Sequence, residues 1–368
     1  MLTQQTIPDE YRQFDDKRLD AIIRKRREQL GKRLCILGHH YQRDEVIRHA
    51  DFTGDSLKLS RQAAEQPDAE FLVFCGVHFM AESADILSAD DQKVVLPNLE
   101  AGCAMADMAD VPAVEEAIDE LSEMTGERII PVTYVNSAAA IKAATGRAGG
   151  ACCTSSNAQR VFEWALKSES DGGAGGGKIF AIPDRHLGLN VAVAMGYSPE
   201  DCVLYEPNKV NGGLTKVDVE RAKFILWRGY CYVHQLFTPE HVTKVRKRHD
   251  GIRVMVHPEC THEVVQLADD VGSTEQIIRT LESAESDSSW AIGTESNLVN
   301  RLATKHKDKF IRVLSDAPAS CFQMARIDQA HLAWALDNLA EGNVVNLIAV
   351  EPEVAADART ALERMINI

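Results

Sequence analysis

One pattern of apolar runs, helices and cysteines occurs three times along this chain, and it restricts the possible folds more than any other feature. Each repeat has an apolar run that ends in polar residues, a hydroxyl-rich turn before a helical pattern, a second apolar run with a polar end, and then a cysteine. Short apolar runs that alternate with helical patterns are typical of parallel sheets with crossover helices. The sequence therefore predicts an α/β fold of three pseudo-symmetric αβα units.

The repeats begin at similar apolar runs, which we interpret as buried strands: RLCILG (33–38), RIIPVTY (128–134) and IRVMV (252–256). They predict three units with the boundaries 1–110, 111–232 and 233–327. A Gly-rich stretch at 170–178 is interpreted as a surface insertion in the second unit, and residues 328–368 are expected to pack with the first. Because ligands bind beyond the carboxyl ends of parallel strands, small sheets around a pseudo-threefold axis would place an active site at the centre.

The charge of the chain argues against polyanionic partners. It has 40 basic and 55 acidic residues and a net charge of -15, so its surface repels nucleic acid and anionic lipid. No apolar run approaches the roughly 18 residues of a spanning helix, and the first residues have no apolar leader pattern. We expect a cytoplasmic protein that binds neither nucleic acid nor membranes.

The chain has nine cysteines and no CxxC pair, so a local zinc site is not expected. One cysteine ends each repeat in a loop of low hydrophobicity: Cys103, Cys231 and Cys321. Three thiolates are one fewer than a cubane iron–sulfur cluster normally has, so one iron would stay open for substrate. Spacing alone leaves a structural role for these three residues open. The role of Cys260 is undecided. Structural roles are favoured for the other five cysteines, which are Cys35, Cys75, Cys152, Cys153 and Cys202.

The hydroxyl-rich turns form a second group. Each precedes a helical pattern, so helix capping explains any one of them. Their recurrence at equivalent places suggests an anion site as well, because helix N-termini present free N–H groups. The ligand predicted from these turns carries phosphate or carboxylates. The residues concerned are Ser56, Ser155, Ser273 and Thr274.

Polar residues at the ends of the first strands form the third group. A histidine can transfer protons near neutral pH, and a carboxylate beside it can hold its tautomer or act as a base. We expect this group to be catalytic if it surrounds an open metal, although a lone histidine at a strand end is more often structural. Its members are His39, Tyr41, Tyr134, Asn136, His234, His257 and Glu259. Six other histidines are expected to be exposed to solvent: His49, His241, His249, His262, His306 and His331.

A series of motifs now indicates a family. They are HHYQ (39–42), ADFTGDSL (50–57), GVHFMAE (76–82), YVNS (134–137), CTSSNA (153–158), PDRHLG (183–188), VHPEC (256–260), VGST (271–274) and GTES (293–296). In this order, over roughly residues 30 to 330, they resemble the quinolinate synthase (NadA) family. His40 and the CFQM string at Cys321 depart from the pattern, and the latter leaves no spare thiols for a redox disulfide switch.

The resemblance implies a transferase of de novo NAD biosynthesis that condenses iminoaspartate with dihydroxyacetone phosphate to quinolinate, phosphate and water. It also implies a 4Fe-4S cluster on Cys103, Cys231 and Cys321, whose open iron acts as a Lewis acid. Functional coupling to L-aspartate oxidase would follow. Catalytic roles are expected for His39, Tyr41, His257 and Glu259. The resemblance places these residues at the substrate: His39, Ser56, Tyr134, Asn136, Ser155, His257, Glu259, Ser273 and Thr274.

Two other functions remain open from the residues alone. The first is a triose phosphate aldolase or dehydratase with zinc bound to histidines, which would lack the brown colour and the absorption near 400 nm of a cluster. The second is a protein that only binds a metal or metabolite, which would show no turnover.

Overall fold

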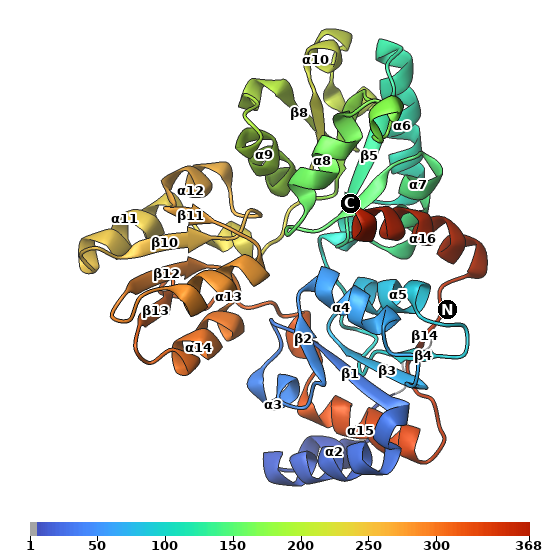
Figure 1. The fold of residues 1–368 in the computed structure, drawn as a ribbon, viewed down its shortest axis with the longest axis vertical. Helices are drawn as coiled ribbons and strands as arrows, with labels where there is room; N and C mark the ends of the chain where they lie inside the picture. Colours follow the sequence, from blue (N-terminus) through green and yellow to red (C-terminus); the bar gives the residue numbers. More distant parts are fainter. Residues whose placement is uncertain (1–5) are drawn as a thin grey trace. The chain divides into compact units, whose positions relative to one another are not determined.

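The structure is a computed structural model that describes residues 6–368, apart from the side chains at positions 57, 60 and 64. Its strands form three separate sheets (Figure 1). The chain divides into two compact units. The first contains the residues up to Cys103 together with Ser320–Glu351, and the second contains Ala104–Ala319 and Pro352–Ile368. Within the described residues, no helix is both long enough and apolar enough to cross a membrane.

The first compact unit contains one five-stranded sheet. Its strands lie in the order β14-β4-β3-β1-β2, and all neighbours are parallel except β14, which is antiparallel to β4. The bounds are β1 (Leu34–His39), β2 (Phe52–Gly54), β3 (Phe71–Cys75), β4 (Lys93–Val95) and β14 (Leu347–Ile348). The helices of this unit are α1 (Asp9–Gln13), α2 (Asp16–Leu30), α3 (Asp44–Ile47), α4 (Ser56–Ala64), α5 (His78–Leu87) and α15 (Gln329–Ala340).

The second compact unit contains the other two sheets, both entirely parallel. One has the order β6-β5-β7-β9-β8, with β5 (Ile129–Tyr134), β6 (Ala151–Cys153), β7 (Lys178–Ile182), β8 (Cys202–Tyr205) and β9 (Phe224–Trp227). The other has the order β11-β10-β12-β13, with β10 (Arg253–Val256), β11 (Asp270–Val271), β12 (Ser289–Gly293) and β13 (Phe310–Val313).

Helices flank both of these sheets. In the sheet of β10 to β13, α11 and α12 lie on one side and α13 and α14 on the other (Figure 1). The bounds in the second unit are α6 (Val111–Thr125), α7 (Ala139–Arg147), α8 (Ala158–Leu166), α9 (Arg185–Ala194), α10 (Lys216–Arg221), α11 (Pro239–Arg248), α12 (His262–Leu267), α13 (Thr274–Ser283), α14 (Ser296–Lys305) and α16 (Pro352–Asn367).

The strand orders confirm the threefold repeat within the chain. Each sheet contains four neighbouring parallel strands in an equivalent order: β2-β1-β3-β4, β6-β5-β7-β9 and β11-β10-β12-β13, where the edge strand β8 precedes β9 in the chain. The order reverses between the first and third strands, which is where open parallel sheets bind their ligands. β1, β3, β5 and β7 are buried along their whole length, because helices cover both faces of a parallel sheet. The predicted α/β class with small parallel sheets is therefore confirmed, and the boundaries at 110 and 232 stay predictions.

The C-terminal segment requires one correction. Its first part follows the prediction: α15 packs on α2, where Arg26 Nε donates to Asp337 at 2.5 Å, and β14 extends the first sheet. Its last helix, α16, instead packs along α7 and β6 in the second unit. The expectation that all of 328–368 packs with the first unit is wrong for α16. An amphipathic pattern shows that a helix has a buried face, but it does not identify the surface that covers it.

Gly146 allows the close approach of α7 and α16. A Cβ atom at this position would lie 2.2 Å from the carbonyl oxygen of Asp357 on α16. We expect Gly146→Ala to lower the free energy of unfolding of the apoprotein by about 2 kcal/mol, because the backbone of α16 must shift. Urea denaturation followed by circular dichroism measures this. Gly102→Ala is the control, since a Cβ there meets nothing within 4 Å, and an equal loss in both variants would contradict the prediction.

Candidate functional site

The ends of the first strands share a local geometry in two of the repeats. His39 Nδ1 accepts a hydrogen bond from the backbone N–H of Tyr41 at 3.1 Å, and His257 Nδ1 accepts one from the N–H of Glu259 at 3.3 Å. His39 and Tyr41 also pack edge to face, with ring centroids 4.7 Å apart. Each histidine is therefore held with its Nδ1 as an acceptor, which leaves Nε2 to carry the proton in the neutral ring.

Glu259 is the centre of a buried network in the second unit. Its side chain is 2% exposed. Tyr134, at the end of β5, donates its hydroxyl proton to Oε1 at 2.5 Å, and His234 Nδ1 lies 2.8 Å from Oε2. Thr294 Oγ1 lies 3.1 Å from the other ring nitrogen of His234. The contacts join side chains that follow β5, β9, β10 and β12, so the carboxyl ends of the two sheets meet here.

The network keeps Glu259 ionised and His257 neutral. Burial opposes ionisation of Glu259, but the neighbouring histidines and the hydrogen bonds from His234 and Tyr134 lower its pKa to about 2. Burial, with a smaller contribution from His234, lowers the pKa of His257 to about 3. Among the groups that lower the pKa of Glu259, the charge interaction with His234 contributes most, ahead of His257 and of the hydrogen bonds from His234 and Tyr134.

His257 connects this network to the hydroxyl-rich turns. Its ring stacks on that of His234 at a centroid distance of 4.4 Å, and its Nε2 lies 3.2 Å from Ser155 Oγ. Ser156 Oγ in turn donates to Ser273 Oγ at 3.0 Å. The turns after β6 and β11 are therefore in contact, and the second and third repeats contribute hydroxyl groups to one place.

Helix capping is part of the role of these turns, as one of the two alternatives predicted. Ser273 is the N-cap of α13 and forms a capping box with Gln276. Thr274 is the first residue of α13 and is buried. In the first repeat the cap of α4 is Asp55, not Ser56, which is the first helical residue. Capping residues with a remaining lone pair can still contact a ligand at a helix N-terminus.

The side-chain oxygen of Asn136, Oδ1, is buried and has no hydrogen-bond partner among the described residues. Leaving a buried acceptor without a partner costs about 1–3 kcal/mol, so a donor on a bound molecule would be stabilised there. This observation is consistent with the predicted place of Asn136 at the substrate.

Asp184 holds the loop that carries Cys231. Its Oδ2 accepts from the backbone N–H of Cys231 at 3.2 Å, while Oδ1 caps α9 by accepting from His186 N and Leu187 N. The backbone N–H of Arg185 donates to the Gly229 carbonyl at 3.0 Å. Burial, assisted by the charge of Glu259, raises the pKa of Asp184 well above its usual range. The position of Cys231 therefore depends on the junction between β7 and α9.

A metal ion could be held next to this network. One ligand atom each of Cys231, His234 and Glu259 lies within 4.8 Å of the others. Thiolate, imidazole and carboxylate are the ligand types of zinc and iron sites. Cys231 is half-buried and forms no disulfide.

The first compact unit brings the loops of the two other candidate ligands together. Cys103 follows β4, and Cys321 precedes α15. Asn98 Nδ2 donates to the Arg326 carbonyl at 3.0 Å, and the Arg326 guanidinium pairs with Glu100 at 2.5 Å. These contacts join the loop before Cys103 to the segment after Cys321.

The strand end of β1 is attached to the same segment. Gln42 Nε2 donates to the Met324 carbonyl at 3.1 Å, and Arg43 donates to the Ala325 carbonyl at 2.9 Å. The loop that begins with His39 and Tyr41 is therefore fixed next to the chain that follows Cys321. The first unit thus groups two predicted ligands and two predicted catalytic residues on connected loops.

The remaining six cysteines are poor candidates for metal ligands. Burial raises the pKa of the thiols of Cys35, Cys75, Cys152 and Cys202 to about 12, and those of Cys153 and Cys260 well above the usual range. A thiol must lose its proton to bind a metal. Cys260, which the sequence left undecided, is completely buried, and its sulfur lies 3.5 Å from the Gly293 carbonyl. Cys103, Cys231 and Cys321 are each partly exposed and form no disulfide.

Two predictions about histidines are wrong. His49 and His331 were expected to be exposed, but their exposed fractions are 3% and 8%. His49 lies 3.2 Å from Asp20 of α2, which covers it. Asp184 and Thr294 were not predicted as site residues. The PDRHLG motif and the equivalent places of Asp184 and Glu295, which cap α9 and α14, are the signals that could have identified Asp184.

Comparisons with known proteins identify the family of the chain. A family model described as Quinolinate synthetase A protein matches residues 21–367. A quinolinate synthase of Streptomyces coelicolor is 54% identical over 357 residues, which cover 96% of this chain and 89% of the relative. One of Acidobacterium capsulatum is 51% identical, with 98% of this chain and 95% of the relative covered. One of Corynebacterium glutamicum is 49% identical, with 99% and 91% covered.

Proposed function

The chain belongs to the NadA family of quinolinate synthetase A proteins, and we propose that it condenses iminoaspartate with dihydroxyacetone phosphate to quinolinate, phosphate and water, as a transferase of de novo NAD biosynthesis. The observation that carries this proposal is the buried network in which Tyr134 and His234 hold Glu259 beside Cys231. It offers an ionised base next to a metal ligand, which is what a condensation with loss of water requires.

The direct test is turnover by the anaerobically purified enzyme. Iminoaspartate generated in the assay and dihydroxyacetone phosphate should give quinolinate, identified by chromatography and mass spectrometry, with equimolar phosphate release. Each substrate omitted in turn is the control. A preparation with full iron content that forms no quinolinate would refute the proposal.

We propose that Cys103, Cys231 and Cys321 hold a 4Fe-4S cluster. The donor set fits: the three cysteines are partly exposed, form no disulfide and follow β4, β9 and β13 at equivalent places in the three sheets, whereas burial raises the pKa of the other six thiols. When bound, the cluster would supply a Lewis-acid iron without a protein ligand. A mononuclear zinc site would instead lack inorganic sulfide and absorption near 400 nm, so sulfide analysis separates the two possibilities.

Anion binding is proposed for the hydroxyl-rich turns. Ser155, Ser273 and Thr274 lie at the turns that contact one another through Ser156 and Ser273, with Ser56 at the equivalent place in the first unit. Hydroxyl and N–H donors at helix N-termini would orient a phosphate or carboxylate group. The unpartnered Oδ1 of Asn136 would accept a hydrogen bond from a protonated group of the substrate.

Proton transfer or orientation of the substrate is proposed for the four residues predicted to be catalytic: His39, Tyr41, His257 and Glu259. Glu259 is ionised and can take a proton, and Tyr134 can donate a hydrogen bond to the same carboxylate as its charge changes. His257 is neutral, with Nδ1 already accepting a bond, so its Nε2–H faces Ser155 and can orient substrate rather than act as a strong acid. His39 and Tyr41 share this local geometry in the first unit, and Tyr41 is proposed to assist dehydration or isomerisation.

Asp184→Asn should weaken retention of the iron. The amide can still accept from Cys231 N, but its NH₂ group must face one of the backbone donors that Asp184 now accepts from. We expect faster loss of absorption near 400 nm in air and a lower iron content, whereas Asp110→Asn should retain both. Asp110 caps α6 in the same compact unit by accepting from Ala113 N, so it controls for the lost cap. Equal iron loss in both variants would show that only fold stability is affected.

Iminoaspartate hydrolyses readily, so we also propose functional coupling to L-aspartate oxidase, which would supply the imine directly. When the oxidase and this protein are diluted together, the yield of quinolinate from aspartate should then fall less than it would if the imine had to diffuse through the solvent between them. The cytoplasmic location and the absence of nucleic-acid partners stay predictions from charge.

A further inference from the structure

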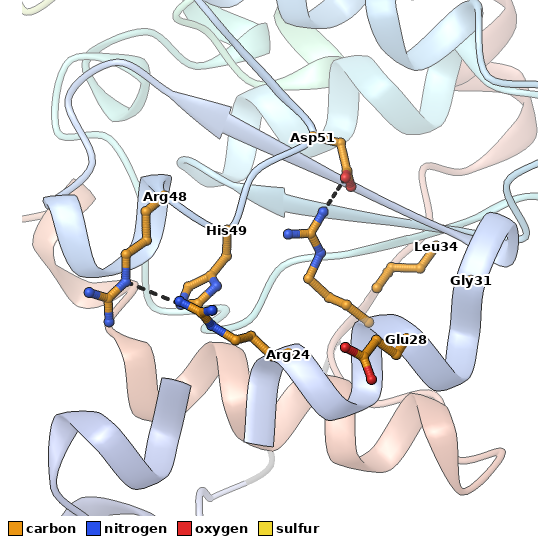
Figure 2. A pocket seen from close by; sticks show the side chains of 8 residues that line it. Arg24, Glu28, Gly31, Leu34, Arg48, His49 and Asp51 are labelled. Atoms are coloured by element: carbon orange, nitrogen blue, oxygen red, sulfur yellow. Dashed lines mark hydrogen bonds and ion pairs between the residues drawn. The ribbon is translucent and has the colours of Figure 1, made fainter. Parts of the chain in front are cut away.

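A cavity of about 590 Å³ lies at the end of the first sheet opposite to His39. Figure 2 shows that its lining comes from α2, from Leu34 at the start of β1, and from the segment after α3 that contains Arg48, His49 and Asp51. His39 ends the same strand that Leu34 begins. The six residues of β1 therefore separate the cavity from the proposed catalytic residues by about 17 Å. Binding in this cavity would be independent of the proposed function.

Three guanidinium groups line this cavity, and carboxylates orient all of them. Asp20 pairs with Arg24 Nε at 2.7 Å and with Arg48 Nη2 at 3.0 Å. Asp51 pairs with Arg27. A guanidinium has five N–H donors in a rigid plane, so one or two bonds to a carboxylate hold the plane in place without using all the donors. The arginines are thus preorganised for an oxyanion rather than neutralised in a buried core.

The surroundings are positively charged although the protein is strongly acidic. Residues 24–33 contain six lysine or arginine residues and one glutamate, in a chain of net charge -15. These positive charges also affect His49. Burial lowers the pKa of His49 to about 4; the three arginines act in the same direction, and Asp20 acts against them. Neutral His49 can therefore accept from Arg48 Nε, which lies 3.4 Å from its Nε2. This contact fixes the Arg48 guanidinium further.

We propose that this cavity binds a phosphate-bearing small molecule of about nucleotide size. Guanidinium groups from two segments can approach a tetrahedral phosphate from different sides, whereas a planar carboxylate is bound well by one bidentate arginine. The volume lies in the range of sites that enclose whole small molecules and is much larger than one phosphate ion. Beyond the arginines, Glu28 offers an acceptor for a hydroxyl group, and Gly31 and Leu34 form an apolar wall.

Isothermal titration calorimetry of the full chain with ADP, adenosine and inorganic phosphate tests the proposal. ADP should bind most tightly, inorganic phosphate more weakly, and adenosine not measurably. The double variant Arg24→Gln/Arg48→Gln should weaken ADP binding by about tenfold or more, and higher ionic strength should act in the same direction. Lys25→Gln is the matched control, since it removes one positive charge from α2 at a residue that does not line the cavity.

Two single variants at the cavity test the proposal further. Arg24 is 69% exposed on its side chain, so the single Arg24→Gln variant should fold normally and still weaken ADP binding several-fold. Glu28→Gln removes a like charge and should tighten inorganic phosphate. Equal binding of adenosine and ADP, unchanged ADP affinity in folded Arg24→Gln/Arg48→Gln, or an equal loss in Lys25→Gln would each overturn the proposal.

Discussion

Cys231→Ser is expected to purify without a stable 4Fe-4S cluster and with quinolinate formation reduced to background. Serine keeps the size of the side chain but is a much weaker ligand for iron than a thiolate. Two of the three ligands would remain. Cys153 and Cys260 of the same compact unit cannot replace the third, because burial raises the pKa of their thiols well above the usual range. Iron and sulfide content after anaerobic purification, together with absorption near 400 nm, measures the effect.

Cys202→Ser provides the matched control for this experiment. Cys202 lies in the same compact unit, is partly exposed, and begins β8. It should retain the iron content, the absorption and the activity of the wild type. Cys103→Ser and Cys321→Ser should behave like Cys231→Ser. If any one of these three kept a full complement of iron and sulfide, the proposed ligand set would be wrong.

The strands could be predicted closely from sequence. The apolar runs at 33–38, 128–134 and 252–256 correspond to β1, β5 and β10 within one residue at each end. Strands covered by helices on both faces are apolar along their whole length, so an apolar run by itself predicts a buried strand. Helix α2 begins at Asp16, where the Asp15 side chain accepts from Arg18 N as a cap. These features depend only on neighbouring residues.

Contacts between distant segments could not be predicted in the same way. Tyr134 and Glu259 are 125 positions apart, and no local pattern connects them. His49 looks like a surface residue because Arg48 and Asp51 flank it, yet α2 covers it. The repeat supplied part of the missing information, since it placed the ends of β5 and β10 at equivalent positions. It could not show that α16 would pack on α7, because α16 lies outside the repeat.

Glu259→Gln is expected to lower turnover on the order of 10²-fold if Glu259 is the general base. Glutamine has the same shape and can still accept from Tyr134, but it cannot take a proton. Its NH₂ group would also face the Nδ1–H of His234, so His234 must change tautomer and donate to Thr294 instead. Iron content and thermal unfolding should stay close to those of the wild type. An unchanged rate would remove Glu259 from this role.

Tyr134→Phe tests how the hydrogen bond from Tyr134 affects the pKa of Glu259. The hydroxyl group of Tyr134 stabilises the ionised carboxylate, so its removal should raise the pKa of Glu259 from its lowered value. Because a base is lost when it becomes protonated, activity falls as pH drops through this pKa. The acidic limb of the rate profile should therefore move to higher pH in Tyr134→Phe, with a smaller loss at neutral pH than in Glu259→Gln. In Glu259→Gln that limb should disappear, and a limb that persists unchanged in both variants would assign it to another group.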